Sequence, residues 1–277
     1  MTAILKIDRL CKTYDNGTCA LREISFSVET GEFVVVLGKS GSGKSTLMRC
    51  INRLVEPTSG RIFLDGEEVT GATPSRLRAL RKKISMIFQQ YNLIPRYSVQ
   101  TNALMGRLAW TSSVASLMNC FSAGDVERSS QVLDRLGLSE KYFDRSENLS
   151  GGQQQRVGLA RALMQGPELI LADEPVSSLD PATSEKVLGL LRDICQEDGI
   201  TAVISLHQLE YAQRFADRII GLSNAHIVFD DAPENLKSKH LDEIYHRSPS
   251  VVAAEGKPAI HKPKTTPITT DVLEIAQ

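Results

Sequence analysis

The fold of this chain is decided by residues 33–47, which read FVVVLGKSGSGKSTL. The residues up to Leu37 are all apolar and mostly β-branched, which is typical of a strand buried on both faces. A helix is predicted from Lys44 to about Leu54. Between the strand and the helix lies a loop that fits G-x-x-x-x-G-K-[ST]. The loop consists of Gly38, Lys39, Ser40, Gly41, Ser42, Gly43, Lys44, Ser45 and Thr46.

A glycine-rich loop between a strand and a helix binds phosphate groups through its backbone. Glycine lets consecutive N–H groups turn toward an anion, and the helix N-terminus adds the positive end of its dipole. Lys44 is expected to reach the outer phosphates, and the Ser45 hydroxyl to ligate Mg²⁺. A plain Gly/Ser turn would lack the flanking strand and helix. The sequence therefore predicts a nucleoside triphosphate site, without saying what hydrolysis drives.

An apolar strand that ends in two acidic residues forms the second part of the predicted site. Residues 169–174 read LILADE. A carboxylate at such a strand end can hold Mg²⁺ beside the phosphate loop, so Asp173 is predicted to be a metal ligand. Glu174 is placed to polarise an attacking water as a general base. Alone, this pair would more often be a solvated strand end, but the phosphate loop upstream favours the catalytic interpretation.

Strands and helices alternate along the rest of the chain. This alternation predicts an α/β fold with a largely parallel sheet. The predicted strands are 4–14, 24–28, 61–65, 84–88, 169–172, 201–206, 218–222 and 226–229, and the further helices include 126–136, 181–196 and 208–215. Residues 91–148 are mostly helical in pattern and predict an inserted subdomain. Residues 248–277, rich in Ser, Pro, Lys and Thr, predict a mobile tail, with a partner-binding segment as the alternative.

The composition excludes several classes of protein. Of the 277 residues, 42% are hydrophobic and 23% charged, an ordinary globular balance. The 32 Lys and Arg nearly balance the 33 Asp and Glu, so a general basic field for nucleic acid is absent. The longest apolar run, residues 33–37, is far shorter than the roughly 20 residues that span a bilayer. With no signal peptide in the sequence, we expect a soluble, cytoplasmic protein, and any role at a membrane would be played from outside the bilayer.

The cysteines agree with a reducing compartment. Their number is odd, and no pair has Cys-x-x-Cys spacing. Buried small hydrophobic side chains are expected, with a reactive or ligand thiol as the alternative. They are Cys11, Cys19, Cys50, Cys120 and Cys195.

Residues 149–153, which read LSGGQ, resemble the signature of the ATP-binding cassette (ABC) ATPases. With the phosphate loop and the acidic strand end, the resemblance covers roughly residues 4–247 in the family's order. It implies a phosphate-loop ABC ATPase domain over 1–247, with an N-terminal antiparallel β subdomain and the helical subdomain inserted at about 91–148. It also implies ATP and Mg²⁺ as cofactors, and a head-to-tail homodimer in which one copy's signature closes over the other's nucleotide. The signature residues concerned are Ser150, Gly151, Gly152 and Gln153.

Other positions take their roles from the same resemblance. Tyr14 matches the aromatic residue that stacks on adenine. Gln89 matches the glutamine that touches Mg²⁺ and the attacking water. Asp180 belongs to the loop that crosses the dimer interface, and His207 matches the switch histidine that contacts the γ-phosphate. Outside this context, Tyr14 and His207 would be read as structural residues.

Two departures from the usual family pattern leave the chemistry intact. Lys39 stands where many relatives carry proline or another uncharged residue. Residues 174–180 read EPVSSLD instead of the commoner EPTSALD. Neither change removes a group needed for Mg²⁺ binding or water activation, so an active ATPase is expected.

The resemblance also indicates which kind of ABC protein this is. The chain has one phosphate loop and one signature, without the coiled coil or zinc modules of ABC ATPases of DNA maintenance or translation, which are the alternative class. We expect separate integral membrane permease subunits, docked at a groove between the glutamine loop and the inserted helices. The chain would lie peripherally on the cytoplasmic face of the cell membrane. It would meet a solute-binding protein only indirectly, and no nucleic acid.

Two segments resemble the ATPases of phosphonate and phosphite importers. Residues 87–94 read IFQQYNLI and residues 205–212 read SLHQLEYA. The stretch 106–124, with Trp110, resembles the extension of that subfamily. An ordinary amphipathic helix packed on the subdomain and a direct permease contact are the two interpretations of this stretch. A polar amino acid importer remains the alternative, because the transported molecule would not touch this chain.

Overall fold

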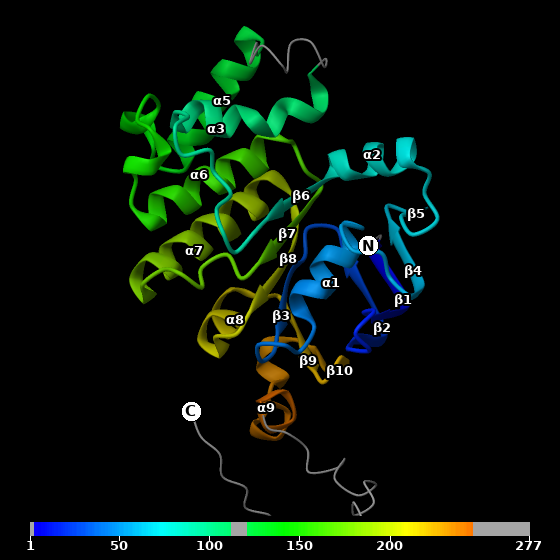
Figure 1. Ribbon diagram of the computed structural model, residues 1–277. Helices are drawn as coiled ribbons and strands as arrows, with labels where there is room; N and C mark the ends of the chain where they lie inside the picture. The colour runs from blue at the N-terminus through cyan, green and yellow to red at the C-terminus, as the bar shows by residue number, and fades with distance from the viewer. Residues whose placement is uncertain (1–2, 112–120, 246–277) are drawn as a thin grey trace, which may run out of the picture. The chain divides into compact units, whose positions relative to one another are not determined.

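Two β-sheets organise the chain in the computed structural model, which describes residues 3–111 and 121–245 (Figure 1). Three predictions therefore lie partly or wholly outside the described residues. These are the tail at 248–277, residues 112–120 of the extension at 106–124, and Cys120.

The N-terminal sheet is antiparallel, with the strand order β2-β1-β4-β5. Its strands are β1 (Ala3–Thr13), β2 (Cys19–Glu29), β4 (Ser59–Leu64) and β5 (Glu67–Glu68). Strand β2 begins well before the predicted residue 24. Thr13 pairs with Cys19 across the hairpin, and irregular register along β1 and β2 breaks the simple alternation of apolar residues. The hairpin is therefore longer than its hydrophobic pattern indicates.

The second sheet has six strands in the order β10-β9-β3-β8-β7-β6. All neighbouring pairs are parallel except β9 and β10, so the predicted largely parallel sheet is confirmed. The strands are β3 (Phe33–Leu37), β6 (Ile84–Ile87), β7 (Leu169–Asp173), β8 (Thr201–Leu206), β9 (Arg218–Ser223) and β10 (His226–Asp231).

Strand β3 is buried on both faces, as its sequence predicts. Val34 and Val36 pack into a core shared with α1 (Lys44–Ile51) and the antiparallel sheet. Val35 and Leu37 pack into a second core on the opposite face. Figure 1 shows the covering layers on the two sides of the sheet. The helices of the second side include α6 (Gly151–Met164), α7 (Pro181–Asp198) and α8 (Leu209–Phe215).

The helical region between β6 and β7 begins later than predicted. The first helix after β6 starts at Val99, where the Ser98 hydroxyl caps it by accepting from the Thr101 amide at 3.1 Å. The residues before it pair with the segment 142–147 instead of forming a helix. The elements here are α3 (Val99–Leu104), η1 (Met105–Trp110), α5 (Ala123–Arg135), η2 (Ser139–Lys141) and η3 (Ser146–Asn148).

The structure corrects the end of one predicted helix and adds two helices. Helix α1 ends at Ile51 and not near Leu54, because Arg53 adopts a left-handed backbone with φ 51°. Helices α2 (Pro74–Lys83) and α9 (Ser238–Tyr245) were not predicted. Leu80 is the only fully buried side chain of α2, so its sequence lacks an apolar stripe.

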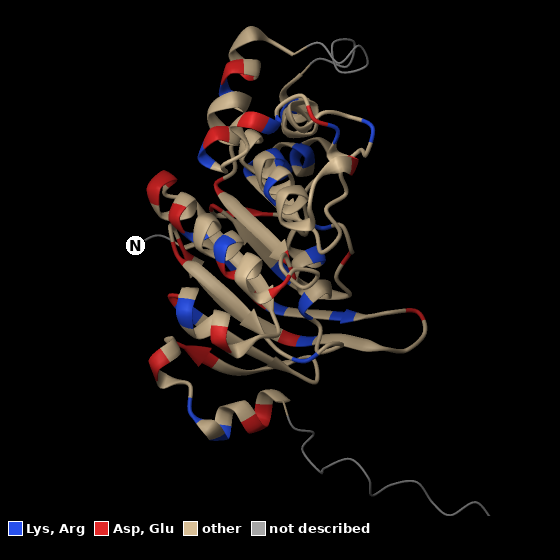
Figure 2. Cartoon of the chain, turned by 90° about the vertical axis from the view of Figure 1, so that its left-hand side faces the viewer, with Lys and Arg blue, Asp and Glu red and all other residues tan. Residues whose placement is uncertain are grey.

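Charge is distributed without a dominant sign. In the view of Figure 2, Lys and Arg alternate with Asp and Glu along the helices and loops. Among the residues that the structure places, no helix combines the length and apolar character needed to cross a bilayer.

Gly106 provides a test of how η1 packs on α6. A Cβ at this position would lie 2.1 Å from the Arg161 carbonyl oxygen and 2.9 Å from the Met164 Cβ. Gly106→Ala should therefore lower the free energy of unfolding by about 1–3 kcal/mol, measured by urea denaturation. Gly189→Ala is the control, because the nearest atom there, on the Phe215 ring, is 3.8 Å away. It should raise stability by about 0.5–1 kcal/mol. Equal stability of the two variants would contradict the close packing at Gly106.

Candidate functional site

The phosphate loop turns sharply between β3 and α1. Gly41 and Gly43 have φ values of 79° and 112°, a left-handed backbone that favours glycine. A Cβ on Gly43 would lie 2.3 Å from the Ala20 carbonyl oxygen. A Cβ on Gly38 would lie 2.4 Å from the Leu222 carbonyl oxygen. The loop is thus held between β2 and β9 by close backbone contacts that only glycine permits.

Lys44 is anchored at the base of this loop. Its side chain is 3% exposed, and its ammonium donates to the carbonyls of Gly38 at 2.8 Å and Lys39 at 3.0 Å. The same Nζ atom lies 3.4 Å from Oε1 of Glu174. The positive charge is therefore fixed between the loop and the end of β7.

Asp173 and Ser45 meet where β7 ends beside α1. The Ser45 hydroxyl donates to Asp173 Oδ1 at 2.8 Å, and Asp173 is 3% exposed. A hydroxyl and a carboxylate oxygen are ligands that suit Mg²⁺, which usually takes only one or two protein carboxylates together with phosphate oxygens and water. No cluster of three His, Cys, Asp or Glu occurs among the described residues. The pair fits a magnesium ion shared with a bound phosphate group better than a metal caged by protein alone.

Glu174 lies between the side chains of Lys44 and His207. Its backbone has φ 48°, in the left-handed region. Its Oε1 faces Lys44, and its Oε2 lies 3.7 Å from Nδ1 of His207. The His207 carbonyl accepts the Tyr245 hydroxyl at 2.9 Å. Burial raises the pKa of Tyr245 to about 12, so this phenol stays protonated and helix α9 stays tied to the residue after β8.

The phosphate loop and Glu174 line a pocket of about 370 Å³, whereas His207 is not among its lining residues. The Tyr14 hydroxyl lies 3.2 Å from the Thr46 hydroxyl, which brings the end of β1 beside the phosphate loop. Several predicted residues line this pocket, namely Tyr14, Ser40, Gly41, Gly43, Lys44, Ser45, Thr46, Gln89 and Glu174. Gly38, Lys39 and Ser42 do not; Gly38 and Ser42 are buried, and Lys39 is exposed. Asp173 lies behind Ser45.

Three lining residues were missed at the sequence level. Thr18, Cys19 and Ala20 lie where β2 begins and form one side of the pocket. No motif marks them, and only the pairing of β1 with β2 places them there. Cys11 and Cys19 are only half-buried, so the expectation of buried cysteines is wrong for these two. Cys50 and Cys195 are buried as expected, and burial raises the pKa of each thiol to about 12.

The signature residues do not line this pocket. Ser150 caps α6 in a capping box with Gln153. A Cβ on Gly152 would lie 2.4 Å from Thr183 Cγ2, so glycine lets α6 approach α7 closely. Asp180 caps α7 by accepting from the Thr183 amide at 3.0 Å, and hydrogen bonding to Thr183 lowers the pKa of Asp180. Like the signature residues, Asp180 is absent from the lining of the phosphate-loop pocket of its own chain.

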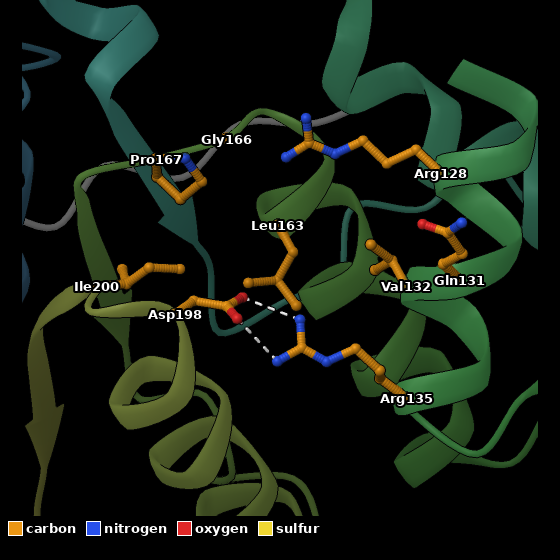
Figure 3. A pocket seen from close by; sticks show the side chains of 9 residues that line it. All are labelled: Arg128, Gln131, Val132, Arg135, Leu163, Gly166, Pro167, Asp198 and Ile200. Carbon is orange, nitrogen blue, oxygen red and sulfur yellow. Dashed lines mark hydrogen bonds and ion pairs between the residues drawn. The ribbon is translucent and has the colours of Figure 1, made fainter. Parts of the chain in front are cut away.

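A second pocket, of about 510 Å³, lies between α5 and the loops that precede β7 and β8 (Figure 3). Arg135 donates to Asp198 at 2.9 and 3.0 Å and to Glu197 at 2.9 Å. The two carboxylates neutralise this guanidinium, which joins α5 to the end of α7. The pocket lacks the glycine-rich turn that presents amides to phosphate, so it is not the nucleotide site.

Comparisons with known proteins agree with this geometry. The family described as "ABC transporter" matches residues 21–177. The chain is 51% identical over 242 residues to "Phosphonates import ATP-binding protein PhnC 2" of Halalkalibacterium halodurans, covering 87% of this chain and 99% of that one. It is 55% identical over 244 residues to "Phosphite import ATP-binding protein PxtA" of Stutzerimonas stutzeri, covering 88% and 87%.

A solved structure, "Dimeric Structure of MJ0796, a Bacterial ABC Transporter Cassette", superposes with a TM-score of 0.73 at 34% identity. The superposition covers 84% of this chain and all of that one. The predicted ABC ATPase fold is thereby confirmed.

The two lysines of the loop should differ sharply in their effect on nucleotide binding. Lys44→Ala removes a buried charge from the pocket, so its affinity for ATP should fall at least about a hundredfold. Lys39→Ala removes an exposed charge that solvent screens, so its affinity should change less than about threefold. Isothermal titration calorimetry of both purified variants measures the difference. Equal losses would contradict the assignment of Lys44 as the phosphate-binding side chain.

Proposed function

The chain belongs to the ABC transporter family of ATP-binding proteins, and on this premise we propose that it is the ATP-hydrolysing subunit of a binding-protein-dependent importer of phosphonates or phosphite. The observation that carries the proposal is sequence identity to the phosphonate and phosphite import ATP-binding proteins. The identity is 51% and 55%, over 87% and 88% of this chain. The phosphate loop, the acidic end of β7 and the histidine after β8 supply the matching chemistry.

Each group at the site has a proposed role in binding ATP. The loop amides and Lys44 hold the β- and γ-phosphates, and Tyr14 stacks on the adenine. Ser45, Asp173 and Gln89 would hold Mg²⁺, which neutralises charge on the phosphates when it is bound.

Glu174 is the proposed general base, and His207 the proposed contact to the γ-phosphate. The ion pair between Lys44 and Glu174 Oε1 supports this assignment, because it places the carboxylate next to the side chain that would hold the outer phosphates. Oε2 of the same carboxylate faces His207. A water between Glu174 and the γ-phosphate would give its proton to the carboxylate while its oxygen bonds to the γ-phosphorus. The bond from that phosphorus to the oxygen that bridges the β- and γ-phosphates breaks in the same step, and ADP and phosphate are released.

The proposed active form is a homodimer with two composite sites. Ser150, Gly151 and Gly152 begin helix α6, and the N-terminus of a helix attracts anions. They do not line the phosphate-loop pocket of their own chain. A second copy, placed head to tail, would bring its signature over this pocket. The dimeric state of the MJ0796 cassette supports this arrangement.

Glu174→Gln should separate ATP binding from hydrolysis. The amide keeps the shape of the side chain but accepts no proton, so kcat should fall at least about a hundredfold. ATP should still bind, and the protein should accumulate as an ATP-bound dimer in size-exclusion chromatography. Glu127→Gln, on the exposed face of α5, is the control and should hydrolyse ATP normally. Near-normal turnover by Glu174→Gln would contradict the general-base assignment.

The proposed permease-docking surface lies in the helical region that follows Gln89. A groove of about 340 Å³ is lined there by Tyr91, Asn92, Leu93, Pro95, Ser146, Glu147 and Gln154. The segment 142–147 forms one side of it, through backbone hydrogen bonds from Ser146 to Tyr97 and from Glu147 to Pro95. Phe143 belongs to this segment and is 84% exposed. An aromatic side chain so exposed, on the segment that supplies one side of the groove, suits an anchor for a cytoplasmic loop of the permease.

The proposed function and this surface can be tested together in cells that lack the native gene. The wild-type gene, expressed with its permease and solute-binding protein, should restore uptake of radiolabelled methylphosphonate or phosphite. Phe143→Ala should lower this uptake about tenfold, although the purified variant hydrolyses ATP as the wild type does. Leu54→Ala is the control, because it also removes an exposed apolar side chain but lies outside the proposed docking surface. Its uptake should equal that of the wild type.

Two outcomes would contradict these assignments. Restored uptake of a polar amino acid, with none of phosphonate or phosphite, would replace the proposed substrate class. Stimulation of the ATPase by DNA or ribosomes instead of permease subunits would place the chain in a different functional class.

A further inference from the structure

Ser205 occupies the centre of the sheet next to the proposed metal ligand. It lies on β8 and is 0% exposed. In the register of the sheet it stands opposite Asp173 on β7 and opposite Val36 on β3. It therefore sits between the acidic strand end and the strand that leads into the phosphate loop, although it does not line the nucleotide pocket.

The Ser205 hydroxyl makes two hydrogen bonds with the acidic pair. Its oxygen accepts from the Glu174 amide at 2.9 Å, and its proton is donated to Asp173 Oδ1 at 2.9 Å. A serine hydroxyl has a single proton. Because the amide of Glu174 occupies a lone pair of the oxygen, the proton is directed toward Asp173.

Asp173 Oδ1 thus receives two hydroxyl donors, from Ser45 and from Ser205. The two donors differ in their surroundings. Ser45 lines the pocket, so its hydroxyl is available to a metal ion. Ser205 lies on the central strand β8, is fully buried and does not line the pocket, so its hydroxyl stays on Asp173. Its bond fixes the direction in which the carboxylate faces Ser45.

We propose that Ser205 is a positioning residue, which orients the Asp173 carboxylate for the Mg²⁺ that accompanies ATP. This inference rests on the proposed function as an ATPase. Side chains that hydrogen-bond to a metal ligand commonly affect metal affinity tenfold or more without touching the metal. Buried hydroxyls on carboxylates act in this way because they fix the rotamer and lone-pair direction of the ligand.

The experiment compares nucleotide binding with and without the metal. The dissociation constant of adenylyl-imidodiphosphate, which is not hydrolysed, is measured by calorimetry in EDTA and in Mg²⁺. Ser205→Ala should leave the value in EDTA unchanged, because Ser205 does not line the pocket. In Mg²⁺ the affinity of this variant for the nucleotide should be about tenfold weaker than that of the wild type. The increase in nucleotide affinity that Mg²⁺ brings, called here the gain from Mg²⁺, is then smaller in the variant.

Ser85→Ala is the matched control. Ser85 is a serine of the same sheet, 1% exposed on β6, and its hydroxyl donates to the Ala162 carbonyl at 2.8 Å. The Ser85→Ala variant loses a buried hydrogen bond that does not involve Asp173, so its gain from Mg²⁺ should equal that of the wild type. Equal losses in the two serine variants would overturn the proposal, because they would show a general effect of a weakened core.

A second pair of variants isolates the hydroxyl if Ser205→Ala does not fold. Ser205→Thr and Ser205→Val have nearly the same shape, and only the first keeps a hydroxyl. Threonine should keep more of the gain from Mg²⁺ than valine. Equal gains in these two variants, or a normal gain in Ser205→Ala, would overturn the proposal. Failure of the wild type to bind the nucleotide in either buffer would instead refute the proposed ATPase function.

Discussion

The site depends on the hydrogen bond that joins the Ser45 hydroxyl to Asp173 Oδ1 at 2.8 Å. This contact connects the helix after the phosphate loop to the end of β7, which are far apart in the sequence. It forms because β7 and β3 flank β8 in one parallel sheet, so their carboxyl ends meet at the same edge. The two cores on the faces of the sheet hold these strands in place. The packing of the sheet thereby sets the geometry of the proposed Mg²⁺ ligands.

The same edge of the sheet gathers the charges that the proposed chemistry needs. Lys44 meets Glu174, Glu174 meets His207, and the hydroxyl of Ser205 joins both acidic residues from within the sheet. The signature at the start of α6 lies outside the pocket. One chain therefore carries two complementary parts of the proposed composite site. A second copy would bring the missing part to each pocket, which explains how dimer formation and hydrolysis can be coupled.

The sequence predicts those parts of the site in which chemistry imposes a fixed spacing. Gly43 must be glycine, because it has a left-handed backbone and lies against Ala20, and this constraint leaves a readable motif. Asp173 is predicted equally well, because it ends an apolar strand. Cys19 and Ser205 reach the site through strand pairing alone, and strand pairing leaves no fixed spacing in the sequence. Helix α2 was not predicted because Leu80 is its only fully buried side chain, so its sequence lacks the apolar periodicity that indicates a helix.

In the proposed homodimer, a single chain holds only half of each catalytic site. The most direct measurement is the rate of ATP hydrolysis per chain, determined for the purified wild-type protein over a wide range of protein concentration at saturating Mg²⁺ and ATP. A site completed by a second copy predicts that the rate per chain rises with concentration and levels off once the dimer predominates. A rate per chain that stays constant down to concentrations at which sedimentation shows only monomers would contradict the account.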